Sequence, residues 1–327
     1  MDQHRRMPAS FSDARPHLRP LIRGRWHLEM PRLQAQIEDA SFDGHLASMP
    51  FSHDSVVLLG YDMPERVMQV GPSELADWNI SFQEGLKMAV QNLRALTRPS
   101  FHAMKSGAQV GDWDDGYDAS RILLPEVIRA CGIDDDLVIM LPSRRAGMLV
   151  APVGSLEAQR WMIDCSRQLI EEHGGLISTA MFRYQDRRVT THQPADAQLA
   201  RKLADLQIVA ANALYAEQKS LLEALHAKQG RDVFVASYQV AERPGLRASA
   251  CSWTRGVTAL LPKTDLVSMV VLDPSGGERH QVKVLDWDTM AQLAGERLRP
   301  VDAYPPRFMV SEFPPEDALA RAPAARV

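Results

Sequence analysis

The sequence contains few cysteines and none of the short motifs that mark common reaction centres. Cys131, Cys165 and Cys251 are far apart and odd in number, so we expect neither a disulfide framework nor a zinc site. HExxH, CxxC, GxSxG, GxxxxGK(S/T) and GxGxxG patterns are all missing. These absences argue against zinc hydrolases, serine hydrolases of the elbow type and common nucleotide-binding enzymes. No cofactor is predicted.

Long apolar runs and a large excess of positive charge are missing as well. No stretch approaches the roughly 20 apolar residues that a membrane-spanning helix needs, and the N-terminus lacks the apolar core of a signal peptide. The net charge of −4 argues against a general nucleic-acid binder. With its unpaired cysteines, the chain is predicted to be a cytoplasmic protein that binds neither membrane nor nucleic acid.

The order of predicted elements favours an α+β fold. A hairpin followed by a helix occurs four times, with helices that begin near Ser73, Ser155, Ala195 and Asp288. Such runs of local hairpins are typical of antiparallel sheets built from successive hairpins, with helices packed on one face.

Four segments are expected along the 327 residues. The first thirty residues concentrate arginines between prolines, which favours a basic flexible arm. The last part is rich in proline and alanine, which favours an extended wrap and a frayed tail. The predicted segments are an arm at 1–40, an N-terminal α+β domain at 41–153, a C-terminal α+β domain at 154–299 and a tail at 300–327.

Several local signals predict individual elements. Ser81 and Glu84 form a capping box in a predicted helix from Trp78 to Leu96. Ser155 and Gly174 are typical of the first and last residues of another helix. The other expected elements are a hairpin of residues 137–141 and 148–150, a hairpin of residues 176–184 and 188–192, a long helix from 195 to about 228, and five strands between 233 and 285.

One part of the chain resembles a known family. The resemblance rests on an ordered string of residues: Tyr61-Asp62-x-Pro64, Leu75-x-x-Trp78, Ala89-x-x-Asn92-Leu93, Tyr117-x-Ala119-Ser120-x-x-Leu123-Leu124 and Pro142-Ser143-Arg144. This string, over about residues 50–153, is similar to the YtpQ-like family of bacterial proteins (domain of unknown function 1444). The resemblance implies a soluble cytoplasmic bacterial protein. It brings no activity, cofactor or catalytic residue.

The acidic turn at residues 112–118 is the candidate for metal chemistry. Hard cations prefer several carboxylate oxygens, and Asp112, Asp114 and Asp118 supply them. The turn does not have the spacing of an EF-hand loop. The alternative interpretation is a solvated turn in which Asp118 caps the following helix.

The candidate binding residues lie near the same turn and on a hairpin tip. Arg144 and Arg145 follow Pro142-Ser143, and guanidinium groups bind carboxylates and phosphates bidentately. Trp113, surrounded by charge, suits an interface anchor. Asp118 and Arg121 are three residues apart, a spacing that allows an ion pair on the surface.

Two hypotheses on function follow from these observations. The first is a non-catalytic protein-binding module, such as an adaptor, an inhibitor or an immunity-type protein. The alternative is a metal-assisted hydrolase that uses Asp112, Asp114 and Asp118, with Asp62 as a further ligand. The sequence leaves the partner's identity and the oligomeric state open.

Overall fold

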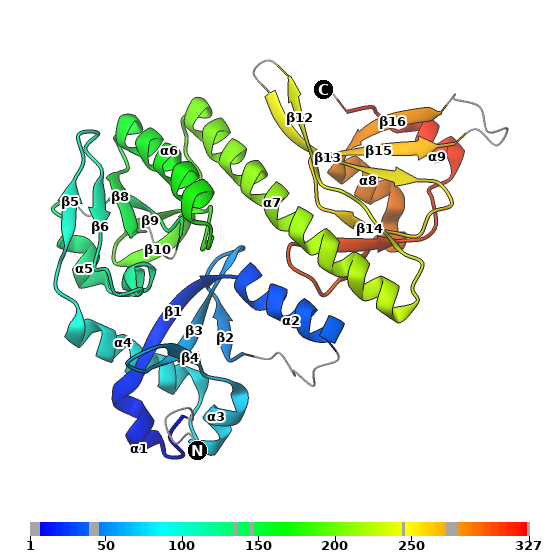
Figure 1. Cartoon of the computed structure of the whole chain (residues 1–327). Helices are drawn as coiled ribbons and strands as arrows, with labels where there is room; N and C mark the ends of the chain where they lie inside the picture. Colours follow the sequence, from blue (N-terminus) through cyan, green and yellow to red (C-terminus); the bar gives the residue numbers. More distant parts are fainter. Residues whose placement is uncertain are drawn as a thin grey trace. The chain divides into compact units, whose positions relative to one another are not determined.

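The computed structural model describes residues 7–38, 46–133, 136–143, 147–243, 246–272 and 280–325 (Figure 1). The chain divides into two compact units. The first consists of Met1–Leu28 and Asp43–Leu206, and the second of Glu29–Phe42 and Gln207–Val327. The helix α7 (Ala197–Gln229) therefore contributes residues to both.

The predicted α+β class is confirmed. The described residues form four sheets, and most neighbouring strands are antiparallel. Two pairs are parallel and were not predicted, β11 with β14 and β13 with β15. Each parallel pair needs a crossover, so local hairpins alone do not build the second unit.

The first unit contains two sheets. The smaller one has the order β1-β3-β2, with β4 also paired to β3, and the larger one has the order β10-β9-β7-β8-β6-β5. The strands of the smaller sheet are β1 (Leu18–Gly24), β2 (Ser48–Pro50), β3 (Ser55–Asp62) and β4 (Val67–Gln69). Those of the larger sheet are β5 (Phe101–Ala103), β6 (Gln109–Gly111), β7 (Leu137–Met140), β8 (Met148–Pro152), β9 (Met181–Gln185) and β10 (Arg188–His192).

Both faces of the larger sheet are covered at its central strands β7 and β8, which explains why these two strands are continuously apolar. Val138 and Met140 face α6 and the start of α7, whereas Leu137 and Ile139 face the opposite core with Ile22. The helices of this unit are α1 (Phe11–Ala14), α3 (Pro72–Asp77), α4 (Phe82–Leu96), α5 (Pro125–Arg129), α6 (Leu156–His173) and the 3-10 helix η3 (Asp118–Leu123). The helix α2 (Trp26–Glu38) begins in this unit and ends in the second.

The predicted basic arm is wrong for its described part. Residues 18–24 form β1, which is almost wholly buried and pairs with β3 along its full length. Leu18, Leu21 and Ile22 enter three different hydrophobic clusters. The burial of these apolar side chains outweighs the polar character that the neighbouring arginines and prolines give to the segment.

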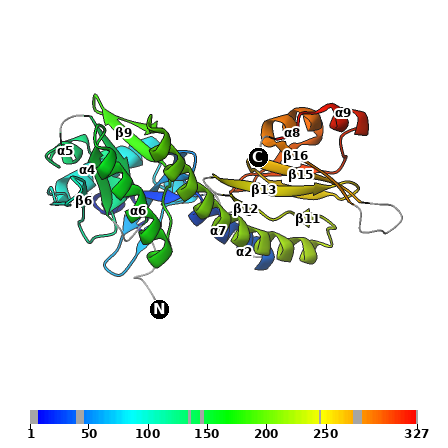
Figure 2. The same cartoon turned by 90° about the horizontal axis from the view of Figure 1, so that it is seen from above.

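The second unit also contains two sheets. One, called here the β13 sheet, has the order β12-β13-β15-β16, and the other has the order β11-β14-β18-β17. Figure 2 shows the β13 sheet with α8 and α9 on the same side. Its strands are β12 (Gln239–Arg243), β13 (Leu246–Thr254), β15 (Leu266–Val271) and β16 (Gln281–Asp286). The remaining elements are β11 (Phe234–Val235), β14 (Ala259–Pro262), β17 (Arg299–Val301), β18 (Arg307–Val310), α8 (Trp287–Ala294), the 3-10 helix η4 (Gly295–Arg297) and α9 (Glu316–Arg321).

The predicted domain boundary and tail differ from the structure. The expected boundary at residue 153 falls directly after β8, yet β7 pairs with β8 on one side and with β9 on the other. A single sheet therefore runs across it. The expected tail contains β18, which lies between β14 and β17, and the helix α9.

Among the local predictions, the caps of α4 and α6 are confirmed. Ser81 and Glu84 form the capping box of α4, although this helix begins at Phe82 and not at Trp78. The Ser155 side chain caps α6, which ends at Gly174 with a φ of 58°. The hairpins β7–β8 and β9–β10 are also present.

Candidate functional site

The acidic turn and η3 bring most of the predicted site residues together in the first unit. Arg121 is 1% exposed and donates to both carboxylate oxygens of Asp115, at 2.8 and 2.5 Å. Its Nε also donates to Thr97 Oγ1 at 3.1 Å. The predicted surface pair with Asp118 is therefore wrong. The segment is a 3-10 helix rather than an α-helix, and the buried Arg121 side chain pairs with the more exposed Asp115.

Asp118 does not cap the helix that it begins. Its buried Oδ1 accepts a hydrogen bond from the Trp113 backbone N–H at 2.8 Å, which closes the acidic turn. Burial raises the pKa of Asp118, and the Trp113 N–H opposes this shift. Burial also raises the pKa of Asp115, but the hydrogen bonds from Arg121 and the Tyr117 N–H outweigh it, so the net shift is downward.

Trp113 has a packing role rather than that of an exposed anchor. The indole Nε1 donates to Arg98 O at 2.6 Å, and the ring makes an edge contact with Phe101 at 5.4 Å. The Arg121 guanidinium lies 4.5 Å from the same ring, a cation–π contact. A side chain at Gly111 would meet the indole at 2.8 Å, so the close packing requires glycine there.

The metal alternative receives no geometric support from the described part of the chain. Asp112 and Asp114 are exposed, and Asp112 Oδ1 accepts the Asp114 backbone N–H at 3.2 Å. Asp62 accepts the Tyr117 hydroxyl at 2.8 Å. Within the described ranges, no group of three or more His, Cys, Asp or Glu side chains is placed to hold a metal ion.

The hairpin arginines and the cysteines are the remaining candidates from the sequence. Arg144 and Arg145 lie outside the described residues, so their predicted role in binding stays a prediction. The three cysteines are free, and burial raises the pKa of each thiol above its ordinary value. A raised pKa reduces the thiolate fraction, which fits core residues better than nucleophiles.

Replacement of Arg121 with methionine is expected to lower the free energy of unfolding by about 2 kcal/mol, because Asp115 and Thr97 lose a charged hydrogen-bond partner. Chemical denaturation of the variant and the wild type would measure the loss. The lowered pKa of Asp115 means that its pairing stabilises the fold above its unfolded pKa and stops doing so as the pH falls through its folded pKa. The difference between variant and wild type should therefore shrink as the pH falls below the ordinary pKa of an aspartate. A difference that grows on acidification would contradict this account.

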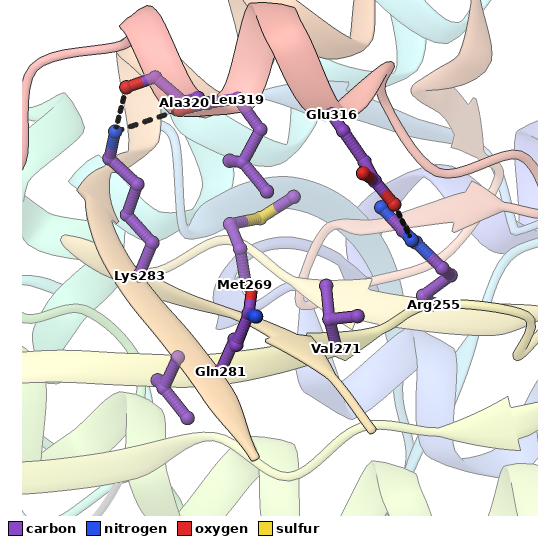
Figure 3. A pocket seen from close by; sticks show the side chains of 9 residues that line it. Arg255, Met269, Val271, Gln281, Lys283, Glu316, Leu319 and Ala320 are labelled. Atoms are coloured by element: carbon purple, nitrogen blue, oxygen red, sulfur yellow. Dashed lines mark hydrogen bonds and ion pairs between the residues drawn. The ribbon is translucent and has the colours of Figure 1, made fainter. Parts of the chain in front are cut away.

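A surface depression in the second unit is the candidate binding site (Figure 3). It has a volume of about 400 Å³ and lies between the sheet strands β15 and β16 and the helix α9. Met269, Val271 and Leu319 give it an apolar floor and wall. The other lining residues are Arg255, Gln281, Val282, Lys283, Glu316 and Ala320.

Two cations stand at opposite ends of the depression, and each reaches α9 (Figure 3). Arg255 forms an ion pair with Glu316 in the first turn of α9. The Lys283 ammonium donates to the carbonyl oxygens of Leu319 and Ala320, at 2.8 and 2.9 Å. These carbonyls are near the C-terminus of α9, where a positive charge complements the helix dipole.

The sequence interpretation missed this site. Its lining residues come from the end of β13, from β15 and β16 and from α9, and the last of these was expected to be a frayed tail. The acidic pair Glu316–Asp317 followed by Arg321 was an available signal, because it is the charge order of a short helix.

Comparison with known proteins does not identify a family for this chain. No family model, no curated protein and no solved structure matches the chain. The resemblance to the YtpQ-like family stays a prediction. In the part of the chain that the structure describes, no helix has both the length and the apolar character needed to cross a membrane.

Proposed function

We propose that this chain is a non-catalytic protein-binding module of the bacterial cytoplasm, of the adaptor, inhibitor or immunity type. The observation that supports the proposal is the depression between β15, β16 and α9. An apolar floor that contains Met269, with Arg255 at its rim, is typical of the side chains that protein interfaces use. Their centres are enriched in methionine and arginine, and their rims are polar.

The position of the depression also favours a polypeptide ligand. It borders the edge strand β16, where Val282 is 56% exposed. A partner seated in the depression would extend over this edge and bury the valine. The buried area would then include both an apolar centre and charged groups that fix the orientation of the partner.

Replacement of Ala320 with arginine tests this function. Ala320 is exposed on α9 and lines the depression, so a long side chain there should obstruct it without entering the core. We expect the wild type, used as bait in lysate of its source cell, to retain a partner stoichiometrically. The Ala320→Arg variant should bind the purified partner at least tenfold more weakly in calorimetry, about 1.4 kcal/mol.

The matched control is Ala213→Arg, an exposed alanine of α7 that does not line the depression. Equal binding by both variants would remove the depression from the proposal. The double variant Arg144→Glu, Arg145→Glu tests the hairpin tip in the same assay. Unchanged binding by it would remove these two arginines.

A further inference from the structure

The edge strand β16 presents alternate backbone groups outward. The backbone N–H and C=O groups that face β15 are those of residues 281, 283 and 285, which lie opposite 271, 269 and 267. The Trp287 N–H continues this ladder by donating to Asp265 O at 3.0 Å. In an antiparallel pair, the N–H and C=O of one residue point to the same side, and those of its neighbours point to the other. The backbone N–H and C=O groups of Val282 and Val284 therefore point away from β15, out of the edge of the sheet.

The end of the chain itself uses one of these outward groups. The Ala325 N–H donates to Val284 O at 2.9 Å. No backbone hydrogen bond to Val282 occurs among the described residues. Pro323 and Ala324 are exposed, and among the described residues after α9 this is the one backbone hydrogen bond to β16. A single backbone hydrogen bond contributes little net free energy, which makes the segment easy to displace.

The side chains along the edge alternate in character. Val282 and Val284 lie on the face of the β13 sheet opposite α8 and α9, because they pair with Val270 and Ser268 rather than with the core residues of β15. Lys283 lies on the helix face, and two of its three donors are occupied by carbonyls of α9. A strand added to this edge would thus place every second side chain beside valine and the others beside Lys283.

We propose that β16 binds an extended segment of a partner protein by strand addition, displacing the residues after α9. The preferred segment alternates β-branched residues, which pack beside Val282 and Val284, with acidic residues, one of which pairs with Lys283 on the helix face. This inference rests on the proposed function and specifies how the partner is held. The backbone hydrogen bonds between β16 and the partner segment supply affinity, and the positive charge of Lys283 selects acidic segments over basic ones.

The test uses the full chain and a labelled synthetic peptide, acetyl-Ser-Val-Glu-Val-Glu-Val-Ser-amide, in fluorescence anisotropy. Val282→Pro removes only an outward N–H, a change that an edge strand tolerates. We expect it to weaken peptide binding at least tenfold, whereas Val282→Ala, which keeps the N–H, should change binding by less than about threefold. A peptide with lysine in place of glutamate should bind at least tenfold more weakly than the acidic one.

Ala325→Pro removes the hydrogen bond of the competing segment. It should strengthen peptide binding roughly two- to tenfold, and Ala325→Gly, which retains the N–H, should not. Equal binding by Val282→Pro and Val282→Ala, or absence of peptide binding, would overturn the inference. Concentration-dependent self-association that Val282→Pro abolishes would also overturn it, since a second copy would then be the occupant. If Ala320→Arg weakens binding of the purified partner and Val282→Pro does not, the proposed module function stands and the strand-addition inference fails.

Discussion

Replacement of Arg307 with methionine is expected to lower the free energy of unfolding by about 4 kcal/mol. Arg307 is fully buried in β18, and no carboxylate pairs with it among the described residues. Its guanidinium instead donates to Gln218 Oε1 at 2.6 Å and to the carbonyl oxygens of Ala236 and Leu260 at 2.8 and 3.1 Å.

The expected size of this loss follows from the acceptors. Methionine fills a similar volume, but it removes the donor from two acceptors, Gln218 Oε1 and Ala236 O, at roughly 1–3 kcal/mol each. Leu260 O still accepts the Ala236 N–H, 3.0 Å away. It also removes the contact of the guanidinium with the Tyr215 ring, 5.2 Å away. Burial lowers the pKa of Arg307 to about 10, so the side chain stays cationic at neutral pH.

Equilibrium denaturation in guanidinium chloride would measure the effect. Arg299→Met is the matched control, because Arg299 is exposed on the neighbouring strand β17 and its loss should change stability by no more than about 0.5 kcal/mol. Arg307→Lys should fall between the two, since an ammonium has fewer donors in a less extended geometry. A loss below about 1 kcal/mol for Arg307→Met would contradict the role assigned to these hydrogen bonds.

Replacement of Asp54 with alanine is expected to have the second largest effect, a loss of about 3 kcal/mol. The buried carboxylate accepts four hydrogen bonds: from Ser52 Oγ at 2.6 Å, Ser178 Oγ at 2.7 Å, the Thr179 N–H at 2.8 Å and Thr179 Oγ1 at 3.2 Å. It thereby joins the segment before β3 to the segment before β9. Both belong to the first unit.

Alanine removes the carboxylate that these four donors share, and loss of the acceptor of a buried donor costs more than the net value of the hydrogen bond. Thermal unfolding would detect the loss as a lower midpoint, with Asp77→Ala as the control on an exposed aspartate at the end of α3. Asp54→Asn separates charge from shape, because its amide oxygen can still accept the Thr179 N–H while its NH2 donates to the Ser178 hydroxyl oxygen. Near-wild-type stability of Asp54→Ala would mean that water replaces the carboxylate.

Local elements of this fold could be predicted because their causes are local. The Ser81–Glu84 capping box and the Ser155 and Gly174 ends of α6 need only neighbouring residues to act. The long helix α7 follows from leucines on one face of the chain, and Leu199, Leu203 and Leu206 are buried as that pattern requires.

The elements that were missed depend on distant partners. The strand β1 contains Pro20 and Arg19 and looks polar, yet it is buried because β3, nearly forty residues later, pairs with it. The strand β18 follows Pro305 and Pro306, and its place between β14 and β17 cannot be read from its own residues. Nothing in a single sequence states which strands will meet.

The candidate site was partly predictable for the same reason. The sequence drew attention to Trp113, Asp118 and Arg121, and the structure brings them together, but as packing rather than as a binding surface. The pairing of Arg121 with Asp115 depends on a 3-10 turn that the spacing rule for α-helices does not describe. The depression on the second unit depends on α9 meeting β16.

The shared helix α7 has a practical consequence for anyone who divides this chain. Leu199 and Leu203 belong to a hydrophobic cluster of the first unit, whereas Tyr215 and Gln218 bond with Pro306 and Pro305 of the second. A cut at residue 153 would separate β7 from β9 and leave β7 as an unpaired, apolar edge strand. A cut in the loop before α7 would spare every strand but would take Leu199 and Leu203 away from their cluster. A cut at the division between the units, after Leu206, would fall inside the helix itself.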